Sequence, residues 1–238
     1  MNRKAAFAGW AALMAFAAVA TFYPGADAWF LWDRPALGCG ELWRLWTGHF
    51  VHFSATHLAG DAVAFALLVS ALRAAGDQPA WVLGVGAPAL SLSLLTADGS
   101  LTAYGGLSGV NALFTARLAR QWINQPGPSR ALGWALLTLA VGKFTLDLSG
   151  LPPIHLPLAS ALVTPCQPSH WLGLLWGCLL PTGSGRNHLP SAERRPLAGE
   201  LVGDAEVEQT ARRGDHDPQD ALWAAGLERA RAVREGEH

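Results

Sequence analysis

Residues 50–72 have the sequence FVHFSATHLAGDAVAFALLVSAL, an apolar stretch of 23 residues interrupted by His52, His57 and Asp61. A membrane-spanning helix needs about 20 apolar residues, because the hydrocarbon core is about 30 Å thick and a helix rises about 1.5 Å per residue. Comparable stretches are residues 5–22, 80–96, 107–122, 131–148 and 158–180. The sequence therefore predicts an all-α membrane protein with six transmembrane helices, the first retained and not cleaved as a signal peptide.

The composition divides the chain into two parts. Apolar residues make up 51% of the chain and charged residues 15%. Residues 1–180 hold 9 Lys and Arg and 7 Asp and Glu, whereas residues 181–238 hold 8 and 11. We expect a six-helix membrane domain over residues 1–180 and a charged, mostly disordered cytoplasmic tail over residues 181–238. No nucleic-acid partner is expected.

The distribution of positive charge predicts the orientation, because short cytoplasmic loops are enriched in Lys and Arg. Placing both termini in the cytoplasm puts most cations on the cytoplasmic side: Arg3, Lys4, Arg73, Arg117, Arg120, Arg130, Arg186, Arg194 and Arg195. The first outer loop, residues 23–46, contains Trp29, Trp32, Trp43 and Trp46. Because indole rings favour the headgroup region, we expect this loop to lie on the outer membrane surface.

Four polar side chains are predicted to lie at similar depth on three helices. Counted from the inner ends, Ser108 and His170 each lie about 15 Å deep, Asp61 about 18 Å and His57 about 24 Å. His155 comes out at about 37 Å and is the poorer candidate for a base. Ionisable groups at such depth usually face a water-filled cavity or one another. The four side chains therefore predict a polar site open to the outer face.

These residue types suit acyl transfer. A serine hydroxyl becomes nucleophilic when an imidazole accepts its proton, and the tetrahedral intermediate needs hydrogen-bond donors for its oxyanion. The amide of Ser108 and the side chain of His57 could serve as those donors. Gly106 and Gly109 have no side chain and so leave space beside the serine. Gly173 and Gly177 favour close approach of the predicted helix 158–180 to the predicted helix 107–122.

Four separated motifs resemble the rhomboid intramembrane serine proteases. They lie within residues 40–180: Trp43-Arg44, His52-x-x-x-x-His57-x-x-x-Asp61, Gly106-Leu107-Ser108-Gly109 and His170-x-x-Gly173-x-x-x-Gly177. The resemblance implies a rhomboid-like bundle with Ser108 as nucleophile and His170 as general base. It also implies an oxyanion or substrate-binding region around His57, Asp61, Gly106 and Leu107.

Within that family the chain is most similar to rhombosortases, on the runs Trp43 to His52 and Tyr104 to Gly109. This resemblance implies an enzyme of the bacterial inner membrane whose active site opens to the periplasm. The implied partners are the lipid bilayer and a single-span membrane protein substrate carrying a GlyGly-CTERM tail.

Two positions depart from the family pattern. Asp61 stands where rhomboids usually have an Asn that donates to the oxyanion, and an ionised Asp only accepts hydrogen bonds. Asp61 would fit if it were protonated by burial or if it turned away to hold His57. Ala112 stands where many rhomboids have an aromatic residue packed on the catalytic histidine. The alternative is therefore a catalytically inactive rhomboid-like protein that binds membrane-protein clients, and a small transporter is a third possibility.

Other polar residues have simpler interpretations. A Zn²⁺ site of His49, His52 and His57 is disfavoured because their spacing does not put all three on one helical face and no HExxH motif is present. No metal or cofactor is therefore expected, and His49 is more structural than chemical. We expect Arg44 to anchor the first loop and Lys143 to pair with Asp147. Whether Cys39 and Cys166 form a disulfide is left open.

Overall fold

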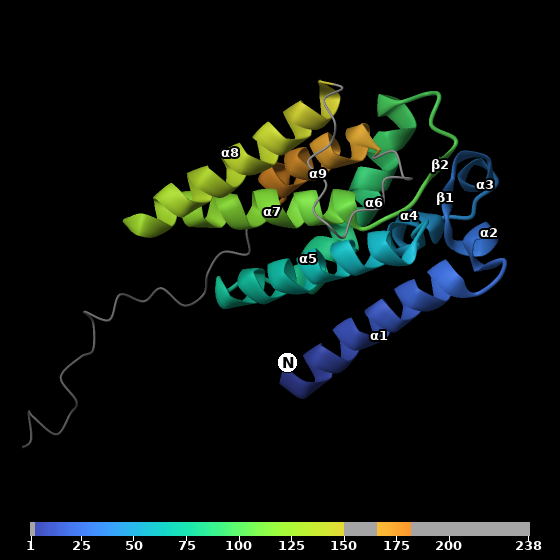
Figure 1. Cartoon of the computed structure of the whole chain (residues 1–238), viewed down its shortest axis with the longest axis horizontal. Helices are drawn as coiled ribbons and strands as arrows, with labels where there is room; N and C mark the ends of the chain where they lie inside the picture. Colours follow the sequence, from blue (N-terminus) through green and yellow to red (C-terminus); the bar gives the residue numbers. More distant parts are fainter. Residues whose placement is uncertain (1–2, 150–165, 182–238) are drawn as a thin grey trace, which may run out of the picture. The chain divides into compact units, whose positions relative to one another are not determined.

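The computed structural model describes residues 3–149 and 166–181. These residues are mostly helical (Figure 1). The elements, in chain order, are α1 Arg3–Phe22, α2 Ala26–Phe30, β1 Trp32–Asp33, α3 Arg34–Gly38, α4 Arg44–Thr47, the 3-10 helix η1 Gly48–Phe50, α5 Ala55–Ala74, α6 Pro79–Ala97, β2 Ala103–Tyr104, α7 Ser108–Ile123, α8 Pro128–Leu148 and α9 Gln167–Leu179.

Three helices, α5, α6 and α8, are long and apolar enough to cross a membrane. At 20, 19 and 21 residues they are each about 30 Å long, which matches the hydrocarbon thickness. The outward side chains of α8 include the exposed Leu132, Leu139 and Leu146. Exposed apolar surface of this kind is typical of a membrane or partner contact. Membrane crossing by α1, α7 and α9 remains a prediction.

The helix bounds correct the sequence prediction at the second segment. Residues 50–72 do not form one helix, because α5 begins only at Ala55. The Ser54 side chain caps it by accepting from the His57 amide at 3.1 Å, and Val51 before it is extended. The remaining predicted helices begin and end within a few residues of α1, α6, α7 and α8. Of the sixth, residues 158–165 lie outside the described residues, as does nearly all of the tail.

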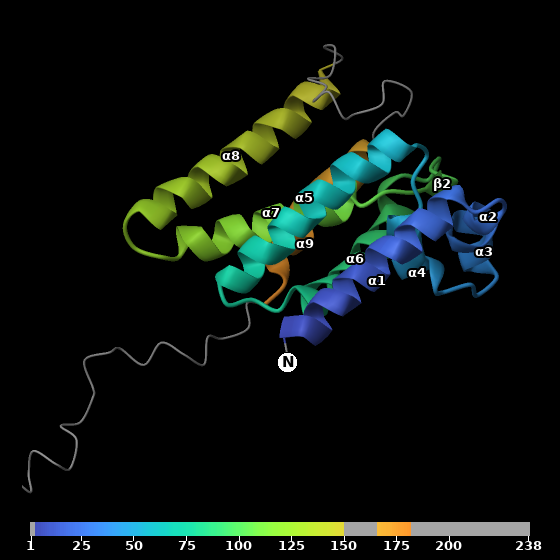
Figure 2. The ribbon, with the colours of Figure 1, turned by 60° about the horizontal axis from the view of Figure 1, so that its bottom comes forward.

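Helix α7 is the central helix of the fold. It packs against α9, α8, α5 and α6, and Figures 1 and 2 both show it running beside α9 and α5. Its side chains Val110, Leu113 and Phe114 have no exposed surface. The position of the residue that begins α7, Ser108, is therefore set by packing on several sides.

A buried cluster around Arg117 links α7 to the connection between α5 and α6 and to the C-terminal end of α9. The fully buried Arg117 donates to Asp77, with Nε 2.6 Å from Oδ2, and to the Leu180 carbonyl at 2.6 Å. Arg120 donates to the same carbonyl at 2.8 Å, and Gln121 donates to Asp77. Arg117 lies within α7, as the predicted segment 107–122 implied, and Asp77 and the Leu180 carbonyl compensate the burial of its charge. These contacts hold α7 in fixed register with both segments.

The first loop folds into short elements and pairs with the segment before α7. Strand β1 pairs antiparallel with β2, Trp32 opposite Tyr104, which is a small exception to the all-α prediction. Trp29, Trp43 and Trp46 are exposed as a surface loop requires, but Trp32 is fully buried and donates to the Ser91 carbonyl at 3.3 Å. The surface prediction is therefore wrong for Trp32, which ties the loop to α6.

The expected anchoring role of Arg44 is confirmed. Its guanidinium donates to Glu41 and, at 2.7 Å each, to the Leu31 and Ala28 carbonyls. The fully buried His49 is likewise structural, because Nε2 lies 2.9 Å from Ser91 Oγ. Burial lowers the pKa of His49 to about 4, so that the ring stays neutral near pH 7.

Candidate active site

Ser108 follows a tight turn that is packed between two histidine-bearing segments. Gly106 has a φ of 116°, and a Cβ there would lie 2.9 Å from His57 Cε1. A Cβ at Gly105 would lie 2.8 Å from the Val51 carbonyl oxygen. Tyr104 Oη closes the turn by donating to the Gly106 carbonyl at 2.9 Å. Only glycine fits at position 106, both for its backbone angle and for its contact with His57.

Helix α9 lies directly against the backbone of α7. A Cβ at Gly173 would overlap the Gly109 carbonyl oxygen, and one at Gly177 would overlap the Leu113 carbonyl oxygen. A Cβ at Gly109 would lie 3.2 Å from Ser169 Cβ. The close approach expected from the small residues is therefore present. It places the residues next to Ser108 and His170 in contact with each other.

The ring of His170 is held by an aromatic residue from α8. Phe144 stacks on it with ring centroids 4.5 Å apart and an angle of 18° between the planes. Ala112, where an aromatic residue was expected from the family pattern, instead has its Cβ 3.0 Å from a Cβ placed at Gly173. Its small size allows the close packing of α9, and Phe144 supplies the aromatic contact. The sequence interpretation missed Phe144.

His170 and Ser108 do not share a hydrogen bond in the described part of the chain. His170 is 5% exposed, its Nδ1 has no partner among the described residues, and Ser108 is half-buried. Catalytic hydrogen bonds are often long or poorly aligned before substrate binds. The absence of this hydrogen bond therefore does not by itself exclude the predicted dyad.

Phe144→Leu should slow serine-directed chemistry because it removes the stacking on His170 while keeping apolar bulk. An aromatic pair contributes about 0.5–1.5 kcal/mol beyond buried area, which corresponds to a roughly 2- to 12-fold slower rate. The measurement is the rate of Ser108 labelling by a fluorophosphonate. Leu139→Ala, an exposed change on the same helix, is the matched control. An unchanged rate for Phe144→Leu would show that the stacking does not position the imidazole.

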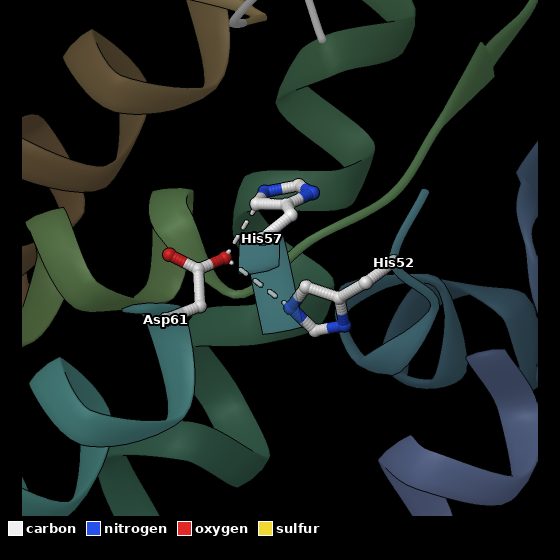
Figure 3. A group of neighbouring side chains, drawn as sticks. All are labelled: His52, His57 and Asp61. Carbon is white, nitrogen blue, oxygen red and sulfur yellow. Dashed lines mark hydrogen bonds and ion pairs between the residues drawn. The ribbon is translucent and has the colours of Figure 1, made fainter. Parts of the chain in front are cut away.

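His52, His57 and Asp61 form one cluster beside the Ser108 turn (Figure 3). Both imidazoles point to the same carboxylate oxygen, with Asp61 Oδ2 3.2 Å from His52 Nε2 and 3.3 Å from His57 Nε2. Asp61 therefore holds His57, which is one of the two ways in which it could fit the site. His57 also stacks on Phe53, with ring centroids 6.3 Å apart.

The sequence did not predict the role of His52 or the presence of Asn111 in the cluster. His52 Nε2 accepts a hydrogen bond of 3.3 Å from the Leu107 amide, next to Ser108. Asn111 Nδ2 donates to the Asp61 carbonyl at 3.1 Å and lies 3.4 Å from Asp61 Oδ1. Asn111 lies three residues after Ser108, which is about one turn of α7. This helical spacing was the one signal in the sequence that could have placed Asn111 near the site.

The remaining predictions near the site have clear outcomes. Lys143 Nζ lies 2.6 Å from Asp147 Oδ2, which confirms the expected pair. Cys39 and Cys166 are free thiols, so the disulfide is not formed. The set His49, His52 and His57, which the sequence disfavoured as a metal site, is not assembled, because His49 bonds to Ser91 and Asp61 lies beside His52 and His57. His155 lies outside the described residues.

No protein-family model matches the chain, and no curated protein matches it. The function must therefore be argued from the motifs and from the site geometry.

Proposed function

We propose that this chain is an intramembrane serine endopeptidase of rhomboid type with a six-transmembrane-helix bundle. Ser108 is the nucleophile and His170 the general base, and no cofactor takes part. The observation that carries the proposal is the packing of Gly173 and Gly177 directly on the α7 backbone, beside Ser108. A two-residue dyad needs such close helix approach, because no buried Asp hydrogen-bonds to His170 among the described residues.

In the proposed reaction His170 accepts the Ser108 proton as Oγ attacks the substrate carbonyl. The developing oxyanion is stabilised by the Ser108 amide at the N-terminus of α7 and by His57. His170 then returns its proton to the leaving amine, and water hydrolyses the acyl-enzyme by the same route. Gly106 and Leu107 form the edge of the substrate-binding region.

The proposed substrate is a single-span protein whose helix unwinds near glycine, as in a GlyGly-CTERM tail. The proposed location is the bacterial inner membrane, with both termini cytoplasmic and the site open to the periplasm. The test is whether the purified chain in liposomes cleaves such a reporter and is labelled at Ser108 by a fluorophosphonate. Failure of both reactions with folded protein would contradict the proposal.

Asp61→Asn should keep or raise the cleavage rate. An amide at this position can still accept from His57 and can also donate toward the oxyanion, whereas a carboxylate repels the developing negative charge. The readout is kcat for reporter cleavage in liposomes. A large loss would show that the carboxylate itself takes part, for example by orienting His57.

The second candidate is a catalytically inactive client-binding protein of the same fold. It is favoured by the carboxylate that accepts from His57 and by the missing hydrogen bond between Ser108 and His170. Such a protein would bind membrane helices but would not react with a fluorophosphonate.

A further inference from the structure

The His52, His57 and Asp61 cluster has the geometry of a transition-metal site. Its three candidate ligand atoms all lie within 4.8 Å of one another. The two distances to Asp61 Oδ2 are 3.2 Å and 3.3 Å (Figure 3). Two ligands bound to one Zn²⁺ at about 2.0–2.1 Å with tetrahedral angles lie about 3.3–3.4 Å apart. The two distances to Asp61 Oδ2 therefore fit a single ion, and a small shift of either imidazole brings the third ligand into range.

The hydrogen bonds of His52 leave an unprotonated ring nitrogen, Nε2, beside the carboxylate. Its Nδ1 lies 3.0 Å from the Phe50 carbonyl oxygen, which can only accept, so Nδ1 carries the proton of a neutral ring. Nε2 and Asp61 Oδ2 are then two acceptors 3.2 Å apart. A cation between them turns this unfavourable contact into a favourable one.

The surroundings of the cluster resemble those of bound metal ions. Metal-binding histidines usually donate their second ring N–H to a carbonyl or carboxylate, as His52 does to Phe50. Coordinating carboxylates are usually hydrogen-bonded themselves, and Asn111 lies 3.4 Å from Asp61 Oδ1. His57 Nδ1 has no partner among the described residues, so it can carry the ring proton when Nε2 acts as the ligand.

We propose that His52, His57 and Asp61 bind a divalent transition metal ion, best matched by Zn²⁺, and that the bound ion inhibits the reaction at Ser108. Two imidazoles and one carboxylate with a fourth position open are a ligand set that Zn²⁺ accepts. The inhibition rests on the proposed hydrolase function, whereas the binding of the ion does not.

Inhibition follows from the atoms that the ion occupies. A metal on His57 Nε2 prevents that atom from donating to the oxyanion. A metal on His52 Nε2 removes the acceptor of the Leu107 amide, which holds the residue before Ser108 in place. Gly106 lies against His57, so that a shift of the ring also displaces the turn.

Binding is tested on the full chain, purified without a polyhistidine tag, stripped with EDTA and titrated with Co²⁺ as a spectroscopic probe. We expect d–d absorption bands for one ion per chain, displaced by Zn²⁺. Asp61→Asn and His52→Gln should each weaken binding at least about tenfold. These substitutions are made in a background variant that lacks other metal-binding side chains. In it Cys39, Cys166 and Cys178 are changed to Ser, and His155, His188, His216 and His238 are changed to Gln.

Two outcomes would overturn the site. One is a folded background variant, checked by its thermal unfolding, that binds no Co²⁺ at millimolar concentration. The other is binding that neither Asp61→Asn nor His52→Gln weakens. Because two independent variants are used, a folding defect in one of them leaves the other as the test.

Inhibition is tested by the ratio of fluorophosphonate labelling in EDTA to labelling in Zn²⁺. The wild-type ratio should be at least about tenfold, and the Asp61→Asn ratio should be near one whatever its absolute rate. Metal binding by a protein that is never labelled would contradict the hydrolase proposal and leave the site intact. If bound Zn²⁺ left the rate of labelling unchanged, the proposed inhibition would be overturned, but the metal site would stand.

Discussion

Ser108→Ala and His170→Ala should each reduce reporter cleavage by at least about a thousandfold while leaving membrane insertion intact. Loss of a nucleophile or of its base costs a serine protease several orders of magnitude in kcat, because the two groups act as one unit. For the same reason the double variant should be no worse than either single variant. The measurements are cleavage of the GlyGly-CTERM reporter in liposomes and gel detection of fluorophosphonate labelling.

Ser70→Ala is the matched control for the loss of a hydroxyl. Ser70 is exposed on α5, and its hydroxyl donates to the Ala66 carbonyl at 2.7 Å, away from the Ser108 turn. This variant should cleave and label at the wild-type rate. Continued processing by either Ser108→Ala or His170→Ala would refute the dyad, and flux of a small solute that survives Ser108→Ala would favour a transporter.

Gly173→Ala should abolish most activity and lower thermal stability. A methyl group at this position would overlap the Gly109 carbonyl oxygen, so α9 must move away from α7 and carry His170 with it. Overpacking of this kind costs about 1–3 kcal/mol, and a displacement of about 1 Å can cost about a hundredfold in rate. The readouts are kcat and the thermal unfolding midpoint in detergent.

Gly142→Ala on α8 is the matched control for Gly173→Ala. A Cβ at Gly142 meets no atom within 4 Å, so the substitution should be tolerated and should gain helix propensity, up to about 1 kcal/mol in soluble helices. If Gly173→Ala and Gly142→Ala behaved alike in rate and stability, the contact between α7 and α9 would not control the site.

Much of the helical framework could be predicted from local sequence. Long apolar runs gave the positions of α6, α7 and α8 to within a few residues, because length and hydropathy are properties of contiguous residues. The start of α5 was missed by five residues, because the Ser54 cap outweighs the apolar pattern before it. Gly173 and Gly177 also predicted the close approach of α9 to α7, because a residue without a side chain allows two helix backbones to come into contact.

The sequence by itself determined the helical class, the helices long and apolar enough to cross a membrane, and the placement of serine and histidine at the heads of helices with glycine-lined faces. These properties depend on which residue types occur and at what spacing. The tertiary structure decided which side chains meet: Phe144 on His170, Arg117 with Asp77, and both imidazoles on Asp61. Such pairings join residues 26 to 40 or only 4 to 9 positions apart. The pairs of Phe144 and Arg117 depend on how whole helices pack, and that of His52 on how the segment before α5 folds back, which no local pattern specifies; only the i,i+4 spacing of His57 and Asp61 is local.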